Sequence, residues 1–583
     1  QYPGVVETYE EPSAYTENRL KEATDYAHYL ATNVYATYGG NFLKKHNYKV
    51  TAGFNYETKY MKTNSAYGYN LLSETLNDFN LIGEDSEGER RMEIKGGQNE
   101  YALAGYFGRI NYDYDGKYLV EFSGRYDGSS RFSSKDRWGF FPSASVGWRL
   151  SEESFLSSAR SWLSNLKVRY SYGNLGNQQV GYYDYLRTIN IGTQSYLFGD
   201  KLPSSASISA PVSSNLTWET VEHHNIGLDA SFFNNRLTFT GEAYIRNTKD
   251  MLTAGISLPA TYGTSSPRMN SADMQTKGYE LSLGWQDMFK LAGKPFSYQV
   301  NLTFNDYTSE ITKFNNPEKA FAKGYYEGMR IGEIWGYHID GLFATDEEAA
   351  SYEVDQRRVN DIINSSSGAL KGLHAGDLRF ADLDGDNIIS TGENTVYNPG
   401  DRRIIGNSEP RYQYGANLAF QWYGFDFSVF FQGIGRMDWY PAHEAELFWG
   451  PFNRAYATFL PKNFLEQCWS EENPNAYFPR PRAYVAYDNM GDQCRELTAK
   501  NDRYLQNIGY CRLKNLTVGY TLPKNWTRKA GIDMLRVYFS GENLACWSGI
   551  KTDYVDPEQA RRGGDLKVYP WQKTFTFGIN VNF

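Results

Sequence analysis

Residues 104–126 read AGYFGRINYDYDGKYLVEFSGRY, and this stretch decides the fold class. Up to residue 114 the even positions are aromatic, aliphatic or small, whereas the odd positions include Arg109 and Asp113. Asp115-Gly116 follows, and both residue types tolerate the positive φ that a tight hairpin turn requires. The alternation then resumes as far as residue 126. A period of two on both sides of a tight turn predicts two antiparallel strands with one apolar face.

The same alternation recurs along the whole chain. Further segments lie near 26–38, 46–60, 143–150, 166–173, 221–233, 237–252, 276–286, 296–310, 411–423, 425–433, 512–522, 534–544 and 574–583, which makes about fifteen in all. Most of them are about ten residues or longer. Strands of soluble proteins average roughly 5–6 residues, whereas strands that cross a membrane need about 9–11. The length of these segments therefore favours a membrane-spanning sheet.

The connections between the segments also alternate in length. Short ones such as Asp115-Gly116, Asn234-Asn235 and Tyr423-Gly424 separate long ones near 61–99, 311–410 and 435–510. Short turns on one side and long loops on the other are typical of outer-membrane barrels. We therefore predict an all-β fold, a large antiparallel transmembrane β-barrel with long extracellular loops at 311–410 and 435–510. The alternative is a soluble all-β protein such as a propeller or a stack of sandwiches.

Composition narrows the class further. The chain has 583 residues, a formal net charge of -9 and 48 tyrosines. It has no run of 18 or more apolar residues, so the sequence predicts no transmembrane helix. A mildly acidic chain lacks the basic surface that nucleic-acid binding requires, and we expect no nucleic-acid partner.

Several motifs resemble one family closely. They are Arg125-Tyr-Asp-Gly-Ser-Ser-Arg-Phe132, Phe140-Phe-Pro-Ser-Ala-Ser-Val-Gly-Trp148, Arg169-Tyr-Ser-Tyr-Gly-Asn-Leu-Gly-Asn177, Leu216-Thr-Trp-Glu219, Lys277-Gly-Tyr-Glu-Leu281, Asp401-Arg-Arg-Ile-Ile-Gly406, Tyr510-Cys-Arg-Leu-Lys-Asn-Leu516, Gly519-Tyr-Thr-Leu-Pro523, Asp556-Pro-Glu558 and Tyr569-Pro570. In this order they resemble the SusC-like (SusC/RagA) TonB-dependent outer-membrane transporters over nearly all 583 residues. The last strand, ending at Phe583, is similar to the terminal strand that outer-membrane barrels present to their assembly machinery.

The resemblance implies a barrel of 22 strands, of which about fifteen lie in residues 1–583. We therefore expect the chain to be the C-terminal barrel portion of a longer transporter, without its N-terminal signal, plug and first strands. The implied localisation is the cell outer membrane, where the strands contact lipid.

The resemblance also implies a function, which is active import of bulky nutrients, oligosaccharides or peptides. The implied partners are a SusD-like surface lipoprotein lid, the TonB-ExbB-ExbD system acting through the N-terminal part, and a second transporter–lipoprotein pair in a dimer. The alternative is a TonB-dependent siderophore or metal-chelate receptor without a lipoprotein lid. A non-transporting adhesin barrel and a soluble glycan-binding β protein are more distant alternatives.

One acidic segment has metal-ligand spacing. Positions 1, 3, 5, 7, 9 and 12 of a calcium loop fall on Asp382, Asp384, Asp386, the carbonyl of Ile388, Ser390 and Glu393. Hard oxygen ligands converging in a tight loop suit Ca²⁺. Position 6, usually glycine, is Asn387, which tolerates positive φ better than most residues. We predict a structural Ca²⁺ site, and the alternative is a solvated acidic turn.

Aromatic residues gather in the second long loop. Trp439, Tyr440, Phe448 and Trp449 form a candidate surface for a substrate or partner, because rings stack on sugars and pack on peptides. The alternative is that they pack the loop against itself. No GxSxG, HExxH or P-loop motif occurs, and we expect no enzymatic activity and no catalytic residues.

All four cysteines lie in the last quarter of the chain. If Val518 pairs with Phe539 in a regular hairpin, Cys511 lies opposite Cys546 and both point inward. The sequence then predicts a Cys511–Cys546 disulfide, with Cys468–Cys494 as the remaining pair. Free thiols are the alternative.

Overall fold

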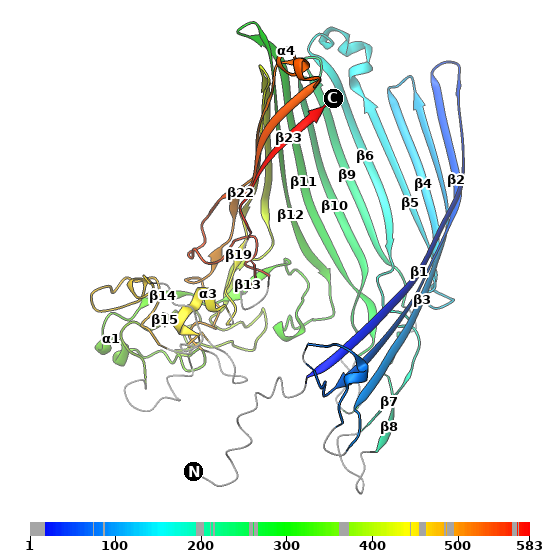
Figure 1. The fold of residues 1–583 in the computed structure, drawn as a ribbon. Coiled ribbons are helices and arrows are strands. Elements are labelled where there is room, and N and C mark those ends of the chain that lie inside the picture. The colour runs from blue at the N-terminus through cyan, green and yellow to red at the C-terminus, as the bar shows by residue number, and fades with distance from the viewer. Residues whose placement is uncertain are drawn as a thin grey trace.

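The computed structural model describes residues 18–73, 75–84, 88–193, 203–209, 211–213, 216–255, 261, 266–360, 372–443, 445–453, 462–482, 485–486, 495–562, 568–569 and 571–583. Fifteen strands form one curved antiparallel sheet, which Figure 1 shows from the side. In sheet order they are β1 (Arg19–Phe42), β2 (His46–Tyr69), β3 (Met92–Tyr114), β4 (Tyr118–Ser129), β5 (Trp138–Arg149), β6 (Leu163–Asn177), β9 (Glu219–Phe232), β10 (Leu237–Ala254), β11 (Arg268–Leu291), β12 (Lys294–Lys313), β17 (Arg411–Trp422), β18 (Phe425–Arg436), β21 (Tyr510–Thr521), β22 (Met534–Ser548) and β23 (Thr574–Asn582).

The predicted all-β antiparallel fold with about fifteen strands is confirmed. Each segment with a period of two lies on one of these strands, and neighbours in the sheet are also neighbours along the chain. The longest strands have 24 residues, which at ~3.3 Å a residue is well beyond the ~30 Å of a bilayer core. These strands therefore extend past the membrane at one end.

The tight turns lie at one end of the sheet, near α4 (Lys524–Thr527) and the C-terminus in Figure 1. Asp115 and Gly116 have φ of 55° and 67°, and Asn234 and Asn235 have φ of 59° and 63°. Positive φ at both central residues matches the twist of the flanking strands. The predicted turn chemistry is confirmed.

The long connections lie at the other end. The prediction of a loop over 61–99 is wrong in extent, because the ladder between β2 and β3 continues from Met61–Asn99 to Gly68–Met92. Backbone pairing there continues through a stretch whose side chains no longer alternate. The loops after β12 and after β18 carry structure of their own.

These loops contain short strands and helices. The strands are β7 (Ile189–Thr193), β8 (Ser204–Ile208), β13 (Glu333–Gly336), β14 (Ile339–Leu342), β15 (Leu378–Phe380), β16 (Arg403–Asn407), β19 (Asp438–Trp439) and β20 (Gln506–Asn507), paired as β7–β8, β13–β16, β14–β15 and β19–β20. The α-helices are α1 (Asp346–Ser351) and α3 (Glu446–Trp449). Short 3₁₀ segments occur at Phe79–Leu81, Phe321–Lys323, Gly450–Phe452 and Leu465–Gln467, and outside these loops at Leu150–Glu152, Ser154–Ala159 and Arg528–Ala530.

The two faces of the sheet differ in chemistry. One face carries apolar rings and branched side chains that no other part of the described chain covers, such as Tyr106, Ile110 and Phe122, which are 57%, 51% and 57% exposed. The opposite face carries ion pairs, some between strands such as Arg169 of β6 with Asp229 of β9, and some within one strand such as Arg125–Asp127. An apolar outer face and a polar inner face are the arrangement of a membrane barrel wall. No helix among the described residues is both long and apolar enough to cross a membrane.

Candidate functional site

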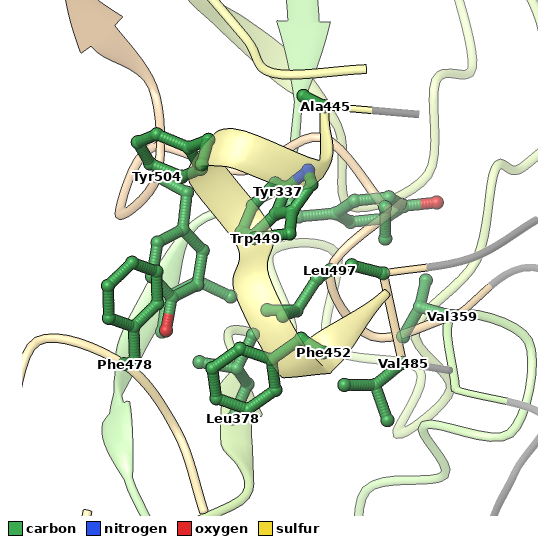
Figure 2. Packing of buried hydrophobic residues seen from close by; sticks show 14 of the residues in the cluster. Tyr337, Val359, Leu378, Ala445, Trp449, Phe452, Phe478, Val485, Leu497 and Tyr504 are labelled. Atoms are coloured by element: carbon green, nitrogen blue, oxygen red, sulfur yellow. The ribbon is translucent and has the colours of Figure 1, made fainter. Parts of the chain in front are cut away.

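Two long loops and one shorter loop fold together into a unit with its own core. We call this unit, residues 314–410, 437–509 and 549–562, the loop domain. Its buried side chains come from all three segments, for example Phe380, Trp449 and Val555. Figure 2 shows how Trp449, Phe452, Phe478, Leu497 and Tyr504 pack around helix α3. Burial of so much aromatic area stabilises the loop domain as a folded body rather than a set of loose loops.

The aromatic cluster predicted as a ligand surface belongs to this core. Phe448 is 2% exposed and Trp449 is fully buried. Their rings pack edge to face, with 4.8 Å between the ring centroids. Trp439 and Tyr440 are partly buried against the same core, and the Tyr440 hydroxyl donates to the Leu497 carbonyl at 2.8 Å. Phe448 and Trp449 are therefore packing residues and offer no binding surface, whereas for the partly exposed Trp439 and Tyr440 the binding surface stays a prediction. The core forms only when two loops distant in the sequence pack together. A pattern within one of these loops does not reveal which of its aromatic residues the other loop covers.

Three charged side chains are buried beside this core. Asp377, Arg482 and Glu496 are 1%, 7% and 2% exposed. An Arg482 Nη donates to Asp377 Oδ2 at 2.8 Å, and the Leu378 N–H donates to Glu496 Oε1 at 2.5 Å. Burial, together with repulsion from Asp377, raises the pKa of Glu496 to about 8. Burial also raises the pKa of Asp377, and this effect is larger than the lowering caused by the positive charge of Arg482. One arginine thus faces two carboxyl groups, and at neutral pH one of these holds a proton.

The acidic loop folds back on itself as the calcium hypothesis requires, but with a different third carboxylate. Carboxylate oxygens of Asp382, Asp384 and Asp401 lie within 4.8 Å of one another. Asp401, fully buried, accepts the backbone N–H groups of Leu383 and Ser390, both at 2.7 Å. Asp401 was not among the predicted ligands, because it lies outside the twelve-residue loop of residues 382–393. Only the folded structure places its carboxylate next to those of Asp382 and Asp384.

Other details of the loop fit the hypothesis in part. Asn387 has φ of 61°, as expected for position 6. Asp382 accepts the N–H groups of Gly385 and Asn387, which holds the loop tight. Asp386 and Glu393 do not join the converging group found among the described residues. Burial and the charges of Asp384 and Asp382 raise the pKa of Asp401. Three carboxylate oxygens within 4.8 Å of one another are hard donors and fit Ca²⁺ better than any softer metal.

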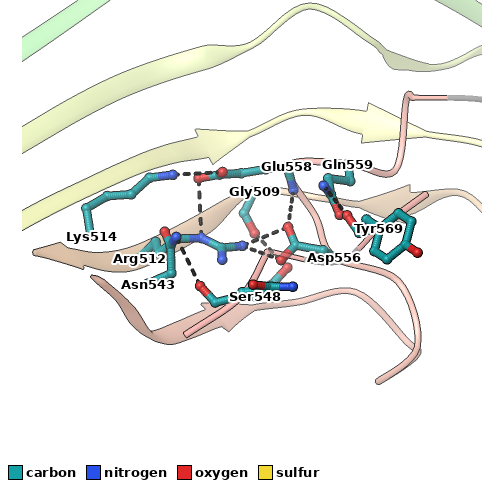
Figure 3. A network of polar contacts seen from close by, with 10 residues as sticks. Gly509, Arg512, Lys514, Asn543, Ser548, Asp556, Glu558, Gln559 and Tyr569 are labelled. Carbon is teal, nitrogen blue, oxygen red and sulfur yellow. Dashed lines mark hydrogen bonds and ion pairs between the residues drawn. The ribbon is translucent and has the colours of Figure 1, made fainter. Parts of the chain in front are cut away.

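A polar network ties the loop domain to the barrel wall. Arg512 on β21 binds both carboxylate oxygens of Asp556 at 2.7 and 2.6 Å, and Lys514 lies 2.8 Å from Glu558 (Figure 3). The Arg512 side chain is 3% exposed. Two motifs 44 residues apart in the sequence therefore meet here, and the sequence alone offered no signal that they pair.

Other motifs converge on a second, smaller core. Phe132, Phe141, Leu216 and Trp218 pack together above the ends of β4 and β5, and the Trp218 indole donates to the Arg137 carbonyl at 2.9 Å. They come from three motifs that are separate along the chain, since Leu216 and Trp218 belong to the same one. This small core holds together the loops next to β4, β5 and β9. The Arg512 network is a separate contact, at β21.

The cysteines do not pair as predicted. Val518 does lie opposite Phe539, but the register shifts between Leu513 and Asn515, and Asn543 on the partner strand has φ of 52°. Cys546 therefore lies opposite Arg512, while Cys511 lies opposite Trp547, on the other face of the sheet. The predicted Cys511–Cys546 disulfide is wrong, since this bulge turns one thiol away.

The second predicted disulfide cannot be assessed as a pair, because Cys494 lies outside the described residues. Cys468 is a buried free thiol whose Sγ donates to the Phe464 carbonyl at 3.4 Å. Burial raises its pKa to about 12. A thiol held neutral in this way is a packing group of the loop domain.

Comparisons with known proteins agree with this geometry. The family model described as TonB dependent receptor-like, beta-barrel matches residues 6–544. The TonB-dependent receptor P3 of Formosa agariphila is 29% identical over 574 residues, covering 94% of this chain and 52% of that protein. The TonB-dependent receptor SusC of Bacteroides thetaiotaomicron is 28% identical over 493 residues, covering 82% of this chain and 44% of that protein.

A solved structure agrees as well. The structure of the RagAB peptide transporter matches with a TM-score of 0.73 at 24% identity, covering 97% of this chain and 56% of that chain. This likeness shows the fold. The chain spans about half the length of the curated relatives it matches.

Proposed function

The chain belongs to the TonB-dependent receptor-like β-barrel family and lies in the outer membrane, and we propose that it forms the wall of an importer for bulky nutrients, oligosaccharides or peptides. The observation that carries this proposal is the two-faced sheet. Apolar side chains line its outer face, ion-paired polar side chains line its inner face, and a folded loop domain stands at one end. Such a wall encloses a polar passage through lipid.

The names of one sequence relative and one structural neighbour support this function. SusC is named as a TonB-dependent receptor, and RagAB is described as a peptide transporter. We propose that the whole receptor containing this chain takes energy from TonB-ExbB-ExbD, carries a SusD-like surface lipoprotein as a lid over the loop domain, and pairs with a second such complex. The loops 311–410 and 435–510 are then extracellular.

The test is purification of the whole receptor from its native outer membrane in detergent, followed by intact mass and proteomic analysis. Import with a lid predicts a co-purifying surface lipoprotein in stoichiometric amount. A receptor that purifies without any lipoprotein, yet confers uptake of a ferric chelate, would support the siderophore alternative instead. A protein that remains in the aqueous phase without detergent would overturn the membrane assignment.

We propose in addition that Asp382, Asp384 and Asp401 hold a structural Ca²⁺. The ion would neutralise three converging carboxylates, one of them fully buried, and so connect the acidic loop to the strand that follows it. Its effect would be on the stability of the loop domain rather than on any reaction.

A further inference from the structure

The connections at the turn end of the sheet differ in charge from the rest of the chain (Figure 1). With one flanking strand residue on each side, they are residues 42–46, 114–118, 149–163, 232–237, 291–294, 422–425 and 521–534, and we call this set the turn belt. It contains ten lysines and arginines but only four acidic residues. The surplus of six positive charges stands against a formal net charge of -9 for the whole chain. A basic belt in an acidic chain points to a partner of negative charge.

The acidic residues of the turn belt are already paired. Their ion pairs are Lys45–Asp115 at 3.2 Å, Lys117–Glu153 at 3.5 Å, Lys524–Asp533 at 3.6 Å and Arg160–Glu152 at 3.7 Å. Arg236 pairs with Asp287 of β11 at 3.3 Å. Among the described residues, no carboxylate forms an ion pair with the five remaining cations, Lys44, Arg149, Lys294, Arg528 and Lys529. The turn belt thus keeps five positive charges that this part of the receptor does not neutralise.

Large apolar side chains stand between these cations. Six of them in the turn belt, between 46% and 80% exposed, are Leu43, Phe155, Trp162, Phe233, Tyr423 and Trp526. Lys294 Nζ lies 5.4 Å from the centroid of the Tyr423 ring. Trp526 is followed closely along the chain by Arg528 and Lys529. Rings and long cationic side chains occur together where a protein meets the headgroup layer of a membrane, because each combines an apolar part with a polar end.

The outer face of the sheet next to the turn belt is apolar. A hollow of about 470 Å³ on this face is lined by outward side chains that include Val146, Tyr118 and Trp148. The Tyr118 hydroxyl and the Trp148 indole N–H both donate to a carboxylate oxygen of Glu153, at 2.7 and 3.1 Å. The change from apolar to charged side chains therefore falls at the edge of the turn belt. Rings with one apolar and one polar end mark the level at which acyl chains give way to headgroups.

The spread of the unpaired cations favours a lipid surface over a soluble acidic protein. They lie in four different connections, from the β1–β2 turn to the β21–β22 connection, and so extend across the sheet. A continuous layer of headgroups reaches all four connections, whereas a compact protein would cover only some of them. The short turns of an outer-membrane barrel face the periplasm, so the turn belt lies at the leaflet on that side. Anionic headgroups balance the surplus charge, and zwitterionic headgroups do not.

We propose that the turn belt binds the phosphate groups of anionic phospholipids in the leaflet that faces the periplasm. These headgroups pair with the exposed cations Lys44, Lys294, Arg528 and Lys529, and the neighbouring rings lie at the boundary with the acyl chains. The inference goes beyond the proposed import function, because it concerns how the receptor is held in its membrane and not what it carries. The lipid supplies the negative charges that the turn belt lacks.

The test compares two triple variants of the whole receptor, purified in detergent. The turn-belt variant removes one unpaired lysine from each of three connections, and its substitutions are Lys44→Gln, Lys294→Gln and Lys529→Gln. The control removes the same charge from three exposed lysines of the loop domain, and its substitutions are Lys323→Gln, Lys500→Gln and Lys551→Gln. Each receptor is titrated with phosphatidylglycerol, with phosphatidylcholine of the same acyl chains, and with soluble glycerol phosphate. Native mass spectrometry counts the bound molecules.

We expect the wild type to bind phosphatidylglycerol about fivefold or more tightly than phosphatidylcholine, and added salt to narrow this preference. The preference should fall below about twofold in the turn-belt variant and stay unchanged in the control. Equal affinity of the wild type for the two lipids, or equal losses in the two variants, would overturn the inference. Glycerol phosphate that binds as tightly as phosphatidylglycerol would overturn it too, since the belt would then be a site for free phosphate.

Discussion

The Arg512 guanidinium lies 2.6 Å from a carboxylate oxygen of Asp556, 44 residues further along the chain. Arg512 belongs to the barrel wall and Asp556 to the loop domain, so this contact joins the two bodies. The same connection contributes Val555 and Ala560 to the loop-domain core. This buried ion pair is therefore one of the contacts that hold the loop domain over the sheet, together with Lys514–Glu558.

Arg512→Met is expected to release this connection. Removing one partner of a buried ion pair costs about 3–5 kcal/mol, because it leaves the other charge without compensation. Limited proteolysis should cut the 549–562 segment faster in the variant while the strands stay protected. Lys45→Met is the control, since its pair with Asp115 is largely exposed and worth little. Equal protection of the segment in both variants would contradict the prediction.

The loop domain should lose stability as pH rises. Glu496 has a pKa raised to about 8, above its ordinary 4.5, so the stabilisation is fully present below pH 4.5 and is lost as pH rises through 8. The loss is about 1.4 kcal/mol for each pH unit between the two values. Hydrogen exchange of the loop-domain core between pH 5 and 9 measures it. Glu496→Gln should flatten the dependence, and Glu466→Gln, at an exposed carboxylate of the loop domain, should not.

Calcium is expected to stabilise the loop domain through three carboxylates. A chelator should lower its unfolding temperature in detergent, and added Ca²⁺ should restore it. Asp384→Asn should abolish this response because it removes one of the converging ligands. Asp386→Asn is the matched control from the same loop and should keep the response. An unfolding temperature that ignores the chelator, or equal effects of the two variants, would rule out the site.

Trp449 should act through stability and not through ligand contact. Trp449→Ala removes a fully buried ring, and such truncations cost about 3–5 kcal/mol. We expect the loop domain of this variant to become protease-sensitive, whereas Trp526→Ala, at a 65% exposed ring, should have little effect. A Trp449→Ala receptor with a protease-resistant loop domain and selectively weaker cargo uptake would restore the ligand-surface interpretation.

Cys511 and Cys546 should both be free. Intact mass after alkylation of the denatured protein, without reductant, should show both thiols modified. Cys546 is exposed and lies opposite Arg512 on the inner face, so it should react first in the folded receptor. A pair of cysteines that resists alkylation until reductant is added, mapped to these two residues, would show that the register is regular after all.

Much of the barrel could be predicted from the sequence, because strand pairing between chain neighbours leaves a local signature. The alternation in residues 104–126 and the turn residues Asp115 and Gly116 report directly on side-chain direction and backbone φ, and both are confirmed. Apolar and polar faces follow from the same period of two, since successive side chains point to opposite faces of a strand.

The site depends on contacts that no local pattern encodes. Asp401 joins Asp382 and Asp384 from outside the predicted spacing, and Phe448 and Trp449 turn inward because a second loop covers them. The bulge that separates Cys511 from Cys546 adds a single residue to one strand, which composition does not reveal.

The sequence by itself therefore determined the all-β class, the middle of each of the fifteen strands and the chemistry of each face, but not how far the longest strands extend. Only the tertiary structure decided which loops share a core, which carboxylates converge and which cysteines face one another. The physical reason is range: alternation and turn conformation act over a few residues, whereas loop packing and register shifts depend on segments brought together by the whole sheet.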